Sequence, residues 1–295
     1  MQMKKYLAFL LAMLLFPAAL AENADTPVLQ VHQIPLGFAD GYLIRLGELD
    51  ILVDGGEPAP QKPERASVEF LRQAGVDTLD VYIVTHWHLD HCMNMNPILA
   101  EFADENTVVY GPSETIPEEI FNGTVTVEIR PAVKGVYRQM KMGDVLDMNG
   151  LTITCIGPAK LSLDGQCNAD SINFVLQYGT RRFLFTGDMA QSGSIVSEYA
   201  ELCANVDVLK FPHHGDQPYE IGQRASRIVR PQYLLVPGVA SEHKLWDFFD
   251  NMGVKFSRDH VYTMADGHVV ILTDGGERFD VLTQQNPADY APKAE

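Results

Sequence analysis

Residues 79–91, LDVYIVTHWHLDH, place a cluster of polar side chains directly after a nearly continuous apolar run. The run 79–84 has the length and the β-branched content of a strand that is covered on both faces. Three of the nine histidines and one aspartate then follow within six residues. The stretch predicts a buried strand that ends in a tight turn, with the first residues of a helix after it.

Two pairs of side chains leave this turn in different directions. His86 and His88 are two residues apart, so in an extended segment they point to the same side. Asp90 and His91 follow where the chain turns. Imidazole and carboxylate ligands suit Zn²⁺, with Mn²⁺ or Fe as alternatives. A solvated polar turn is the competing interpretation, but it leaves this density of ligands unexplained, so we predict that the turn feeds two metal positions.

A site for two metals needs ligands from other parts of the chain. The run FLFTGD ends in Asp188, and VLKFPHHG ends in His213 and His214, each after an apolar strand. An aspartate in the position of Asp188 is ordinarily a helix N-cap. The repetition of polar residues at three strand ends instead favours convergence on one site.

Short strands and helices alternate along the chain. Expected strands include 28–34, 41–46, 50–56, 107–112, 206–212, 232–238 and 267–276, with a hairpin at 171–188 and a run of strands over 123–158. Expected helices cover 63–75, 96–104, 192–204, 219–229 and 242–253, and the polar tail after Gln284 is expected to fray. Helices on the outside of two strand-rich halves indicate an α/β (α+β) fold, a four-layer helix–sheet–sheet–helix sandwich in a single domain over residues 22–295.

The first 21 residues have the features of a secretory signal peptide. Lys4 and Lys5 precede an apolar run, and Ala19-Leu20-Ala21 forms an A-x-A cleavage site. The apolar run is shorter than the ~20 residues that span a bilayer, so we expect export and no stable membrane insertion after cleavage. The four cysteines are too few for a disulfide scaffold, although one disulfide is compatible with an extracytoplasmic location.

The chain is acidic, with a formal net charge of −17. Loss of Lys4 and Lys5 with the signal peptide takes this to about −19, from the removal of two positive charges. Such a surface repels nucleic acid and anionic lipid at long range. A polyanionic substrate therefore needs strong local positive charge, which two metal ions supply.

These motifs carry a resemblance to a known family. HWHLDH (residues 86–91) resembles the HxHxDH signature of the metallo-β-lactamase superfamily, and the TGD and PHHG motifs follow in the order of that family. The segments 32–56, 170–188, 206–215 and 261–271 together look like the hydrolase domain of ComEC-type DNA-uptake proteins and related secreted phosphodiesterases, including teichoic-acid phosphorylcholine esterases. The resemblance covers nearly all of the chain after the signal peptide. It implies a metallo-β-lactamase-type αββα sandwich.

The resemblance also implies a role for each residue that matches a motif. His86 and His88 would bind the first of two Zn²⁺ ions, Asp90 and His91 would bind the second, and Asp188 would bridge both. His214 is favoured as a further ligand and His213 as the proton donor, while Asp90 would also hold the nucleophile. Asp54 would support the site from behind the ligands.

The chain departs from the family pattern in the segment 164–174, DGQCNADSINF. Many members have another histidine there, and this chain has none. The first metal position could instead be completed by water, by Asp188, and by Asp170 or Cys167. We expect this position to hold its ion more weakly than a site that keeps the histidine.

Three functions fit the motifs. The first is an exported dinuclear metal-dependent hydrolase, most readily a phosphodiesterase acting on nucleic acid, a cell-wall polymer such as teichoic acid, or a headgroup phosphodiester. The second is an amide, lactone or thioester hydrolase, including a β-lactamase, which normally keeps the histidine missing here. The third is a catalytically silent metal-binding module in DNA uptake or envelope assembly.

Overall fold

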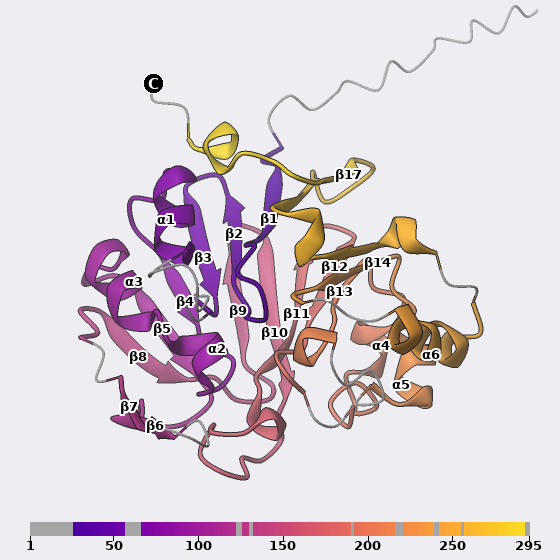
Figure 1. The fold of residues 1–295 in the computed structure, drawn as a ribbon, viewed down its shortest axis with the longest axis horizontal. Helices are drawn as coiled ribbons and strands as arrows, with labels where there is room; N and C mark the ends of the chain where they lie inside the picture. The colour runs from indigo at the N-terminus through magenta and orange to yellow at the C-terminus, as the bar shows by residue number, and fades with distance from the viewer. Residues whose placement is uncertain are drawn as a thin grey trace, which may run out of the picture.

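The core of this computed structural model lies between two sheets that face each other (Figure 1). The structure describes residues 26–56, 66–121, 126–129, 132–189, 192–215, 221–238, 242–254 and 257–292. The expected signal peptide at 1–21 lies outside these residues. Among the helices that are described, none has the length and apolar character needed to cross a membrane.

The first sheet has eight strands in the order β17-β16-β1-β2-β3-β4-β5-β8. Their bounds are Phe279–Leu282 (β17), Val269–Thr273 (β16), Leu29–Gln33 (β1), Tyr42–Leu46 (β2), Leu49–Val53 (β3), Val81–Ile83 (β4), Val108–Gly111 (β5) and Val136–Gln139 (β8). Strands β1 to β3 pair antiparallel, whereas β3, β4, β5 and β8 pair parallel. The strand predicted from the run 79–84 is thus β4, which pairs in parallel with β3 on one edge and with β5 on the other.

The second sheet has seven strands in the order β15-β14-β13-β12-β11-β10-β9. Their bounds are Val261–Thr263 (β15), Tyr233–Val236 (β14), Val208–Lys210 (β13), Arg181–Phe185 (β12), Asn173–Tyr178 (β11), Leu151–Gly157 (β10) and Val145–Met148 (β9). The expected hairpin is β11–β12, and β12 to β15 run parallel. A separate pair, β6 (Glu119–Phe121) and β7 (Thr126–Glu128), lies at one edge.

Helices cover the outer face of each sheet, which makes the four layers. The helices α1 (Ala66–Gln73) and α3 (Met95–Phe102) pack on the first sheet through a buried apolar cluster. This cluster includes Phe70 of α1 and Leu52 and Tyr82 of the sheet. The helices α4 (Ala200–Cys203), α5 (Gln223–Val229) and α6 (Glu242–Met252) share another with the second sheet. The expected four-layer αββα sandwich is confirmed.

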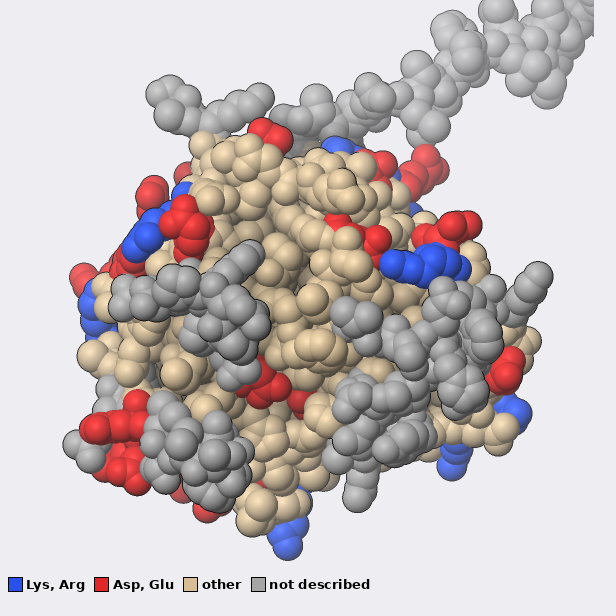
Figure 2. Space-filling view, viewed as in Figure 1, with Lys and Arg blue, Asp and Glu red and all other residues tan. Residues whose placement is uncertain are grey.

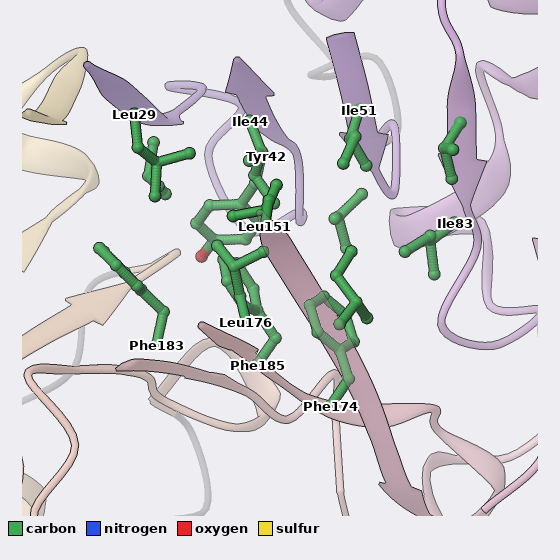
Figure 3. Packing of buried hydrophobic residues seen from close by; sticks show 14 of the residues in the cluster. Leu29, Tyr42, Ile44, Ile51, Ile83, Leu151, Phe174, Leu176, Phe183 and Phe185 are labelled. Atoms are coloured by element: carbon green, nitrogen blue, oxygen red, sulfur yellow. The ribbon is translucent and has the colours of Figure 1, made fainter. Parts of the chain in front are cut away.

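Aromatic and aliphatic side chains fill the space between the sheets (Figure 3). Ile44 and Ile51 come from the first sheet, while Phe174 and Phe185 come from the second, with ring centroids 4.8 Å apart. Tyr42 meets Phe185 edge-on at 5.4 Å. Burial of a side chain of this size contributes roughly 1.5–3 kcal/mol each. This apolar layer fixes the positions of the strand ends that carry the polar motifs.

Two expectations about local structure were wrong. The segment 192–204 was expected to be helical, but only Ala200–Cys203 is, and turns precede it. Ser197 explains the difference, because its hydroxyl bonds to the carbonyl of Ser194 and accepts from the amide of Tyr199. Serine side chains that bond to nearby backbone compete with helix formation.

The C-terminal tail is the second correction. Instead of fraying, it forms a 3-10 turn at Pro287–Tyr290 that packs on α1. The guanidinium of the buried Arg45 donates to the carbonyl of Tyr290 at 3.0 Å, and the ring of Tyr290 contacts His32 and His268. Polar composition gave no sign of these contacts, because all of them are made with residues distant in the chain.

Candidate metal centre

The polar motifs all follow the carboxyl ends of parallel strands. Asp54 follows β3, the HWHLDH motif follows β4, Asp188 follows β12, and His213 and His214 follow β13. The carboxyl ends of neighbouring parallel strands meet at one edge of their sheet, which is where ligands bind in folds of this kind. The two sheets face each other, so their motifs meet across the sandwich. The expected convergence of three strand ends is what the structure shows.

Four side chains form a compact group of potential ligands. Asp90, His91, Asp188 and His214 each offer one ligand atom, and these atoms all lie within 4.8 Å of one another. Asp188 Oδ2 is 3.2 Å from His91 Nε2 and 3.4 Å from His214 Nε2, and Asp90 Oδ2 is 2.9 Å from His214 Nε2. Two imidazoles and two carboxylates are a suitable set for Zn²⁺ or a similar divalent ion.

His86 and His88 lie beside this group. The ring centroid of His86 is 4.1 Å from that of His91 and 4.6 Å from that of His88. Nδ1 of His86 faces the hydroxyls of Thr85 and Ser171 at 3.2 and 3.3 Å. Its buried Nε2 has no hydrogen-bond partner among the described residues. Among the described residues, His86 and His88 lie outside the four-residue group, as two adjacent imidazoles beside it, and their role as ligands of a first metal stays a prediction.

Two buried carboxylates orient the imidazoles of the four-residue group. Asp54 Oδ2 lies 2.9 Å from His91 Nδ1, and its other contacts are the amide and hydroxyl of Thr85. Asp40 Oδ1 lies 3.2 Å from His214 Nδ1. When Nδ1 carries the proton and donates to a carboxylate, the lone pair of Nε2 is left for a cation. Asp54 thus lies where it was expected, and Asp40 faces the second histidine as a nearby negative charge.

Asp40 and Lys210 were missed in the sequence. Both are almost completely buried, and the ammonium of Lys210 contacts Asp40 Oδ2. Lys210 Nζ also donates to the carbonyl of Gly187 at 2.6 Å and lies 3.5 Å from Asp188 Oδ1. The available signal was a lysine inside the apolar strand VLKFP, since a buried ammonium requires a carboxylate partner.

The carboxylates and imidazoles of the group shift one another's protonation. Burial by itself would lower the pKa of His91, but Asp188, Asp54 and Asp90 raise it well above its usual value. Burial would raise the pKa of Asp188, yet His91 and His214 hold it well below its usual range. The group thus attracts positive charge, so a proton and a cation compete for the same nitrogen.

The contacts of Asp170 do not favour it as the residue that completes the first metal position, and among the described residues it belongs to no group of potential ligands. Its carboxylate accepts three backbone amide hydrogens, from Ser162 at 2.5 Å and from Leu163 and Gly165 at 2.8 Å. A buried carboxylate bonded in this way holds a loop together. Among the described residues, Cys167 is not part of any group of potential ligands, and it is a free thiol like Cys92, Cys155 and Cys203.

The PHHG segment has an unusual backbone. His213 and His214 both have positive φ, 49° and 52°. This left-handed conformation is uncommon for residues other than glycine and clusters at functional sites. It directs His214 into the buried group, whereas the side chain of His213 is 21% exposed and its Nε2 lies 3.9 Å from Asp188 Oδ2. The two histidines therefore occupy different positions, one within the group and one at its border.

Buried polar atoms without hydrogen bonds give evidence for a metal centre that does not depend on any sequence motif. Buried polar atoms are normally hydrogen-bonded, and each exception requires an explanation. Among the described residues, Nε2 of His86, Nε2 of His91 and both oxygens of Asp188 are buried without a hydrogen bond. All belong to the region where the motifs converge. Divalent cations would satisfy these atoms together.

Part of this centre reaches the surface. The side chain of Asp90 is 28% exposed, whereas that of Asp188 is 1% exposed. Figure 2 shows acidic atoms near the middle of this face, close to the place where Figure 1 draws α2 (Leu89–Cys92). A substrate can therefore approach from the side of Asp90.

Comparison with known proteins agrees with the fold and the motifs. The chain is 25% identical over 156 residues to ComE operon protein 3 of Bacillus subtilis (strain 168), a match over 52% of this chain and 19% of that protein. It spans about a fifth of that relative's length. The metallo-β-lactamase fold protein YhfI from Bacillus subtilis has a similar structure, with a TM-score of 0.54 and 16% identity over 84% of this chain and 100% of that one.

The ComEC-like resemblance expected from the sequence is thereby confirmed, while the YhfI structure supports the fold. The superfamily fold implies a dinuclear metal site, and the group around Asp188 supplies candidate ligands for it. The model of the metallo-β-lactamase superfamily matches residues 34–238, and the chain belongs to that superfamily of metal-dependent hydrolases.

Proposed function

We propose that this chain is an exported phosphodiesterase that depends on two divalent metal ions. Zn²⁺ is the expected metal, with Mn²⁺ or Fe as alternatives. The observation that carries the proposal is the convergence of Asp90, His91, Asp188 and His214, with His86 and His88 beside them. The expected signal peptide at 1–21 supports export. The substrate would be a phosphodiester in nucleic acid, a cell-wall polymer or a lipid headgroup.

Two features favour a phosphodiester over an amide or lactone. The resemblance to ComE operon protein 3 supports the branch that the sequence motifs indicate. The chain also lacks the histidine in 164–174 that β-lactamases normally keep, and Asp170 does not replace it. Divalent ions held by these residues would activate water and neutralise negative charge on the phosphoryl oxygens.

The protein's own side chains would prepare the reaction. Asp54 would hold a proton on Nδ1 of His91, so that its Nε2 faces the centre, and Asp40 lies 3.2 Å from Nδ1 of His214. Asp90, the partly exposed carboxylate of the group, would accept a hydrogen bond from the attacking water. His213, at the border of the group, would donate a proton from Nε2 to the leaving oxygen.

Assays with two substrates test this proposal. Purified protein supplied with Zn²⁺ or Mn²⁺ is expected to hydrolyse bis-p-nitrophenyl phosphate and not nitrocefin. His88→Ala should lower the phosphodiesterase rate by roughly 100-fold or more, because it removes an imidazole from the centre. His260→Ala is the matched control, since His260 is exposed and contacts the carbonyl of Gln232 away from the centre.

The other outcomes identify the competing functions. Nitrocefin turnover without phosphodiester turnover would make the chain a β-lactamase-like enzyme. Metal binding without turnover of either substrate would make it a binding module.

A further inference from the structure

Lys210 places an ammonium group in the interior of the candidate metal centre. The residue ends β13 and is 2% exposed. Its Nζ contacts Asp40, the carbonyl of Gly187 and, at 3.5 Å, Asp188 Oδ1. A cation is costly to bury, and it is unexpected next to a site that is built to bind other cations. The candidate metal ligands alone therefore do not explain why a lysine is buried at this position.

The two oxygens of Asp188 face different partners. Oδ1 is the oxygen next to Lys210 Nζ. Oδ2 faces the imidazoles, at 3.2 Å from Nε2 of His91, 3.4 Å from Nε2 of His214 and 3.9 Å from Nε2 of His213. The carboxylate is thus turned so that one oxygen points to an ammonium and the other to the nitrogens that would hold a metal.

Asp40 fixes the position of the ammonium. It is 1% exposed, and its Oδ2 contacts Lys210 while its Oδ1 contacts Nδ1 of His214. The carbonyl of Gly187 supplies a second anchor from the residue before Asp188. If Lys210 moved away from Asp188, the buried Asp40 would lose the cation that contacts its Oδ2.

We propose that Lys210, anchored by Asp40 and Gly187, is a positioning residue that restricts Asp188 to metal coordination through Oδ2 alone. The positive charge attracts Oδ1 and repels a metal ion from that oxygen. One ligand atom fewer on the metal keeps a position open for substrate, which a catalytic centre needs. The inference rests on the metal centre of the proposed function, but its test does not depend on which substrate is hydrolysed.

Replacement of the metal by Co²⁺ gives a direct readout, because visible absorption by Co²⁺ weakens as its coordination number rises. Lys210→Met keeps an unbranched side chain, one heavy atom shorter, and removes the charge. We expect this variant to lose roughly half or more of the visible absorption per bound cobalt, since Oδ1 becomes available as a second ligand atom. Lys210→Arg keeps the charge and is expected to restore the wild-type spectrum at least in part.

Two further variants keep the test decisive. Lys210→Met alone leaves Asp40 unpaired and can prevent folding, so the double variant Lys210→Met with Asp40→Asn removes both charges. Asn keeps a polar oxygen beside His214 Nδ1, and the double variant is expected to show the same loss of absorption. Arg45→Met is the matched control, because it breaks the buried Arg45–Asp50 pair away from the centre.

The outcomes separate this inference from the proposed function. Unchanged cobalt spectra in folded Lys210→Met and in the double variant would overturn the inference, even if the wild type hydrolyses phosphodiesters. An equal change in Arg45→Met would also overturn it, because general loosening would then explain the result. A wild type that hydrolyses no phosphodiester, with the expected spectral change in the Lys210 variants, would instead refute only the choice of substrate.

Discussion

Asp54→Asn should weaken metal binding although it removes none of the candidate ligands. In the native protein, Asp54 Oδ2 accepts from His91 Nδ1 at 2.9 Å, while Oδ1 accepts from the amide of Thr85 at 2.7 Å. An amide keeps an oxygen for Thr85 but turns an NH₂ group towards His91. To keep that contact, His91 must move its proton to Nε2, which removes the lone pair that would bind the metal.

The magnitude follows from the loss of this support. Substituting a residue that orients a metal-binding histidine typically costs 10–100-fold in metal affinity, or about 1.4–2.8 kcal/mol. We expect the upper half of this range, because the contact is fully buried and water cannot replace the carboxylate. Competition with a chromophoric chelator measures the zinc affinity, and circular dichroism checks the fold.

Asp50→Asn is the control for general loss of stability. Asp50 is a buried aspartate within β3, the strand that Asp54 follows, and it receives two hydrogen bonds from Arg45 at 2.6 and 2.8 Å. Its substitution breaks a buried ion pair and should cost roughly 3 kcal/mol of stability, with unchanged zinc affinity. Equal zinc affinity in Asp54→Asn and the wild type would refute the reasoning, and so would an equal loss in both variants.

Three further predictions concern metal removal, the Asp170 loop and pH. Removing zinc with a chelator should lower the free energy of unfolding by about 4 kcal/mol when zinc was present at about 1,000 times its Kd, and a thermal melt that does not move would contradict this. Asp170→Ala leaves three backbone amides unpaired and should destabilise the protein by roughly 3 kcal/mol, with no change in bound metal per chain by elemental analysis. The pKa of His32 is lowered by burial first, and then by the nearby charges of His268 and Arg45. Near pH 6.5 the unfolded chain therefore takes up a proton that the folded chain does not. The free energy of unfolding falls as the pH drops below that value. In denaturant titrations at pH 7.5, 6 and 5, His32→Leu should therefore show a shallower loss, by up to about 1.4 kcal/mol per pH unit, and parallel curves would contradict the assignment.

Much of the fold could be predicted because the strands carry their own signals. Apolar runs such as 79–84 and 183–185 lie next to turn residues, so the positions of their strands followed from the sequence. The convergence of the strand ends could also be predicted, because polar residues there have no role in a core. The helix expected at 192–204 could not be predicted correctly, since serine hydroxyls bond to the local backbone there.

The supporting residues of the centre were harder to find. Asp40 and Lys210 are 170 positions apart in the numbering, and neither belongs to a recognisable ligand motif. Their pairing depends on the packing of one sheet on the other, which no local pattern encodes. Asp170 illustrates the reverse difficulty, because an acidic residue near the expected site binds backbone amides of its own loop.

The central claim is that four strand-end segments enclose a pair of metal ions, and anomalous diffraction at the zinc edge tests it most directly. Crystals of the zinc-loaded protein should show a strong peak in contact with His91, Asp188 and His214, and a second beside His86 and His88. Zinc peaks confined to surface sites, with none within bonding distance of Asp188, would contradict the account.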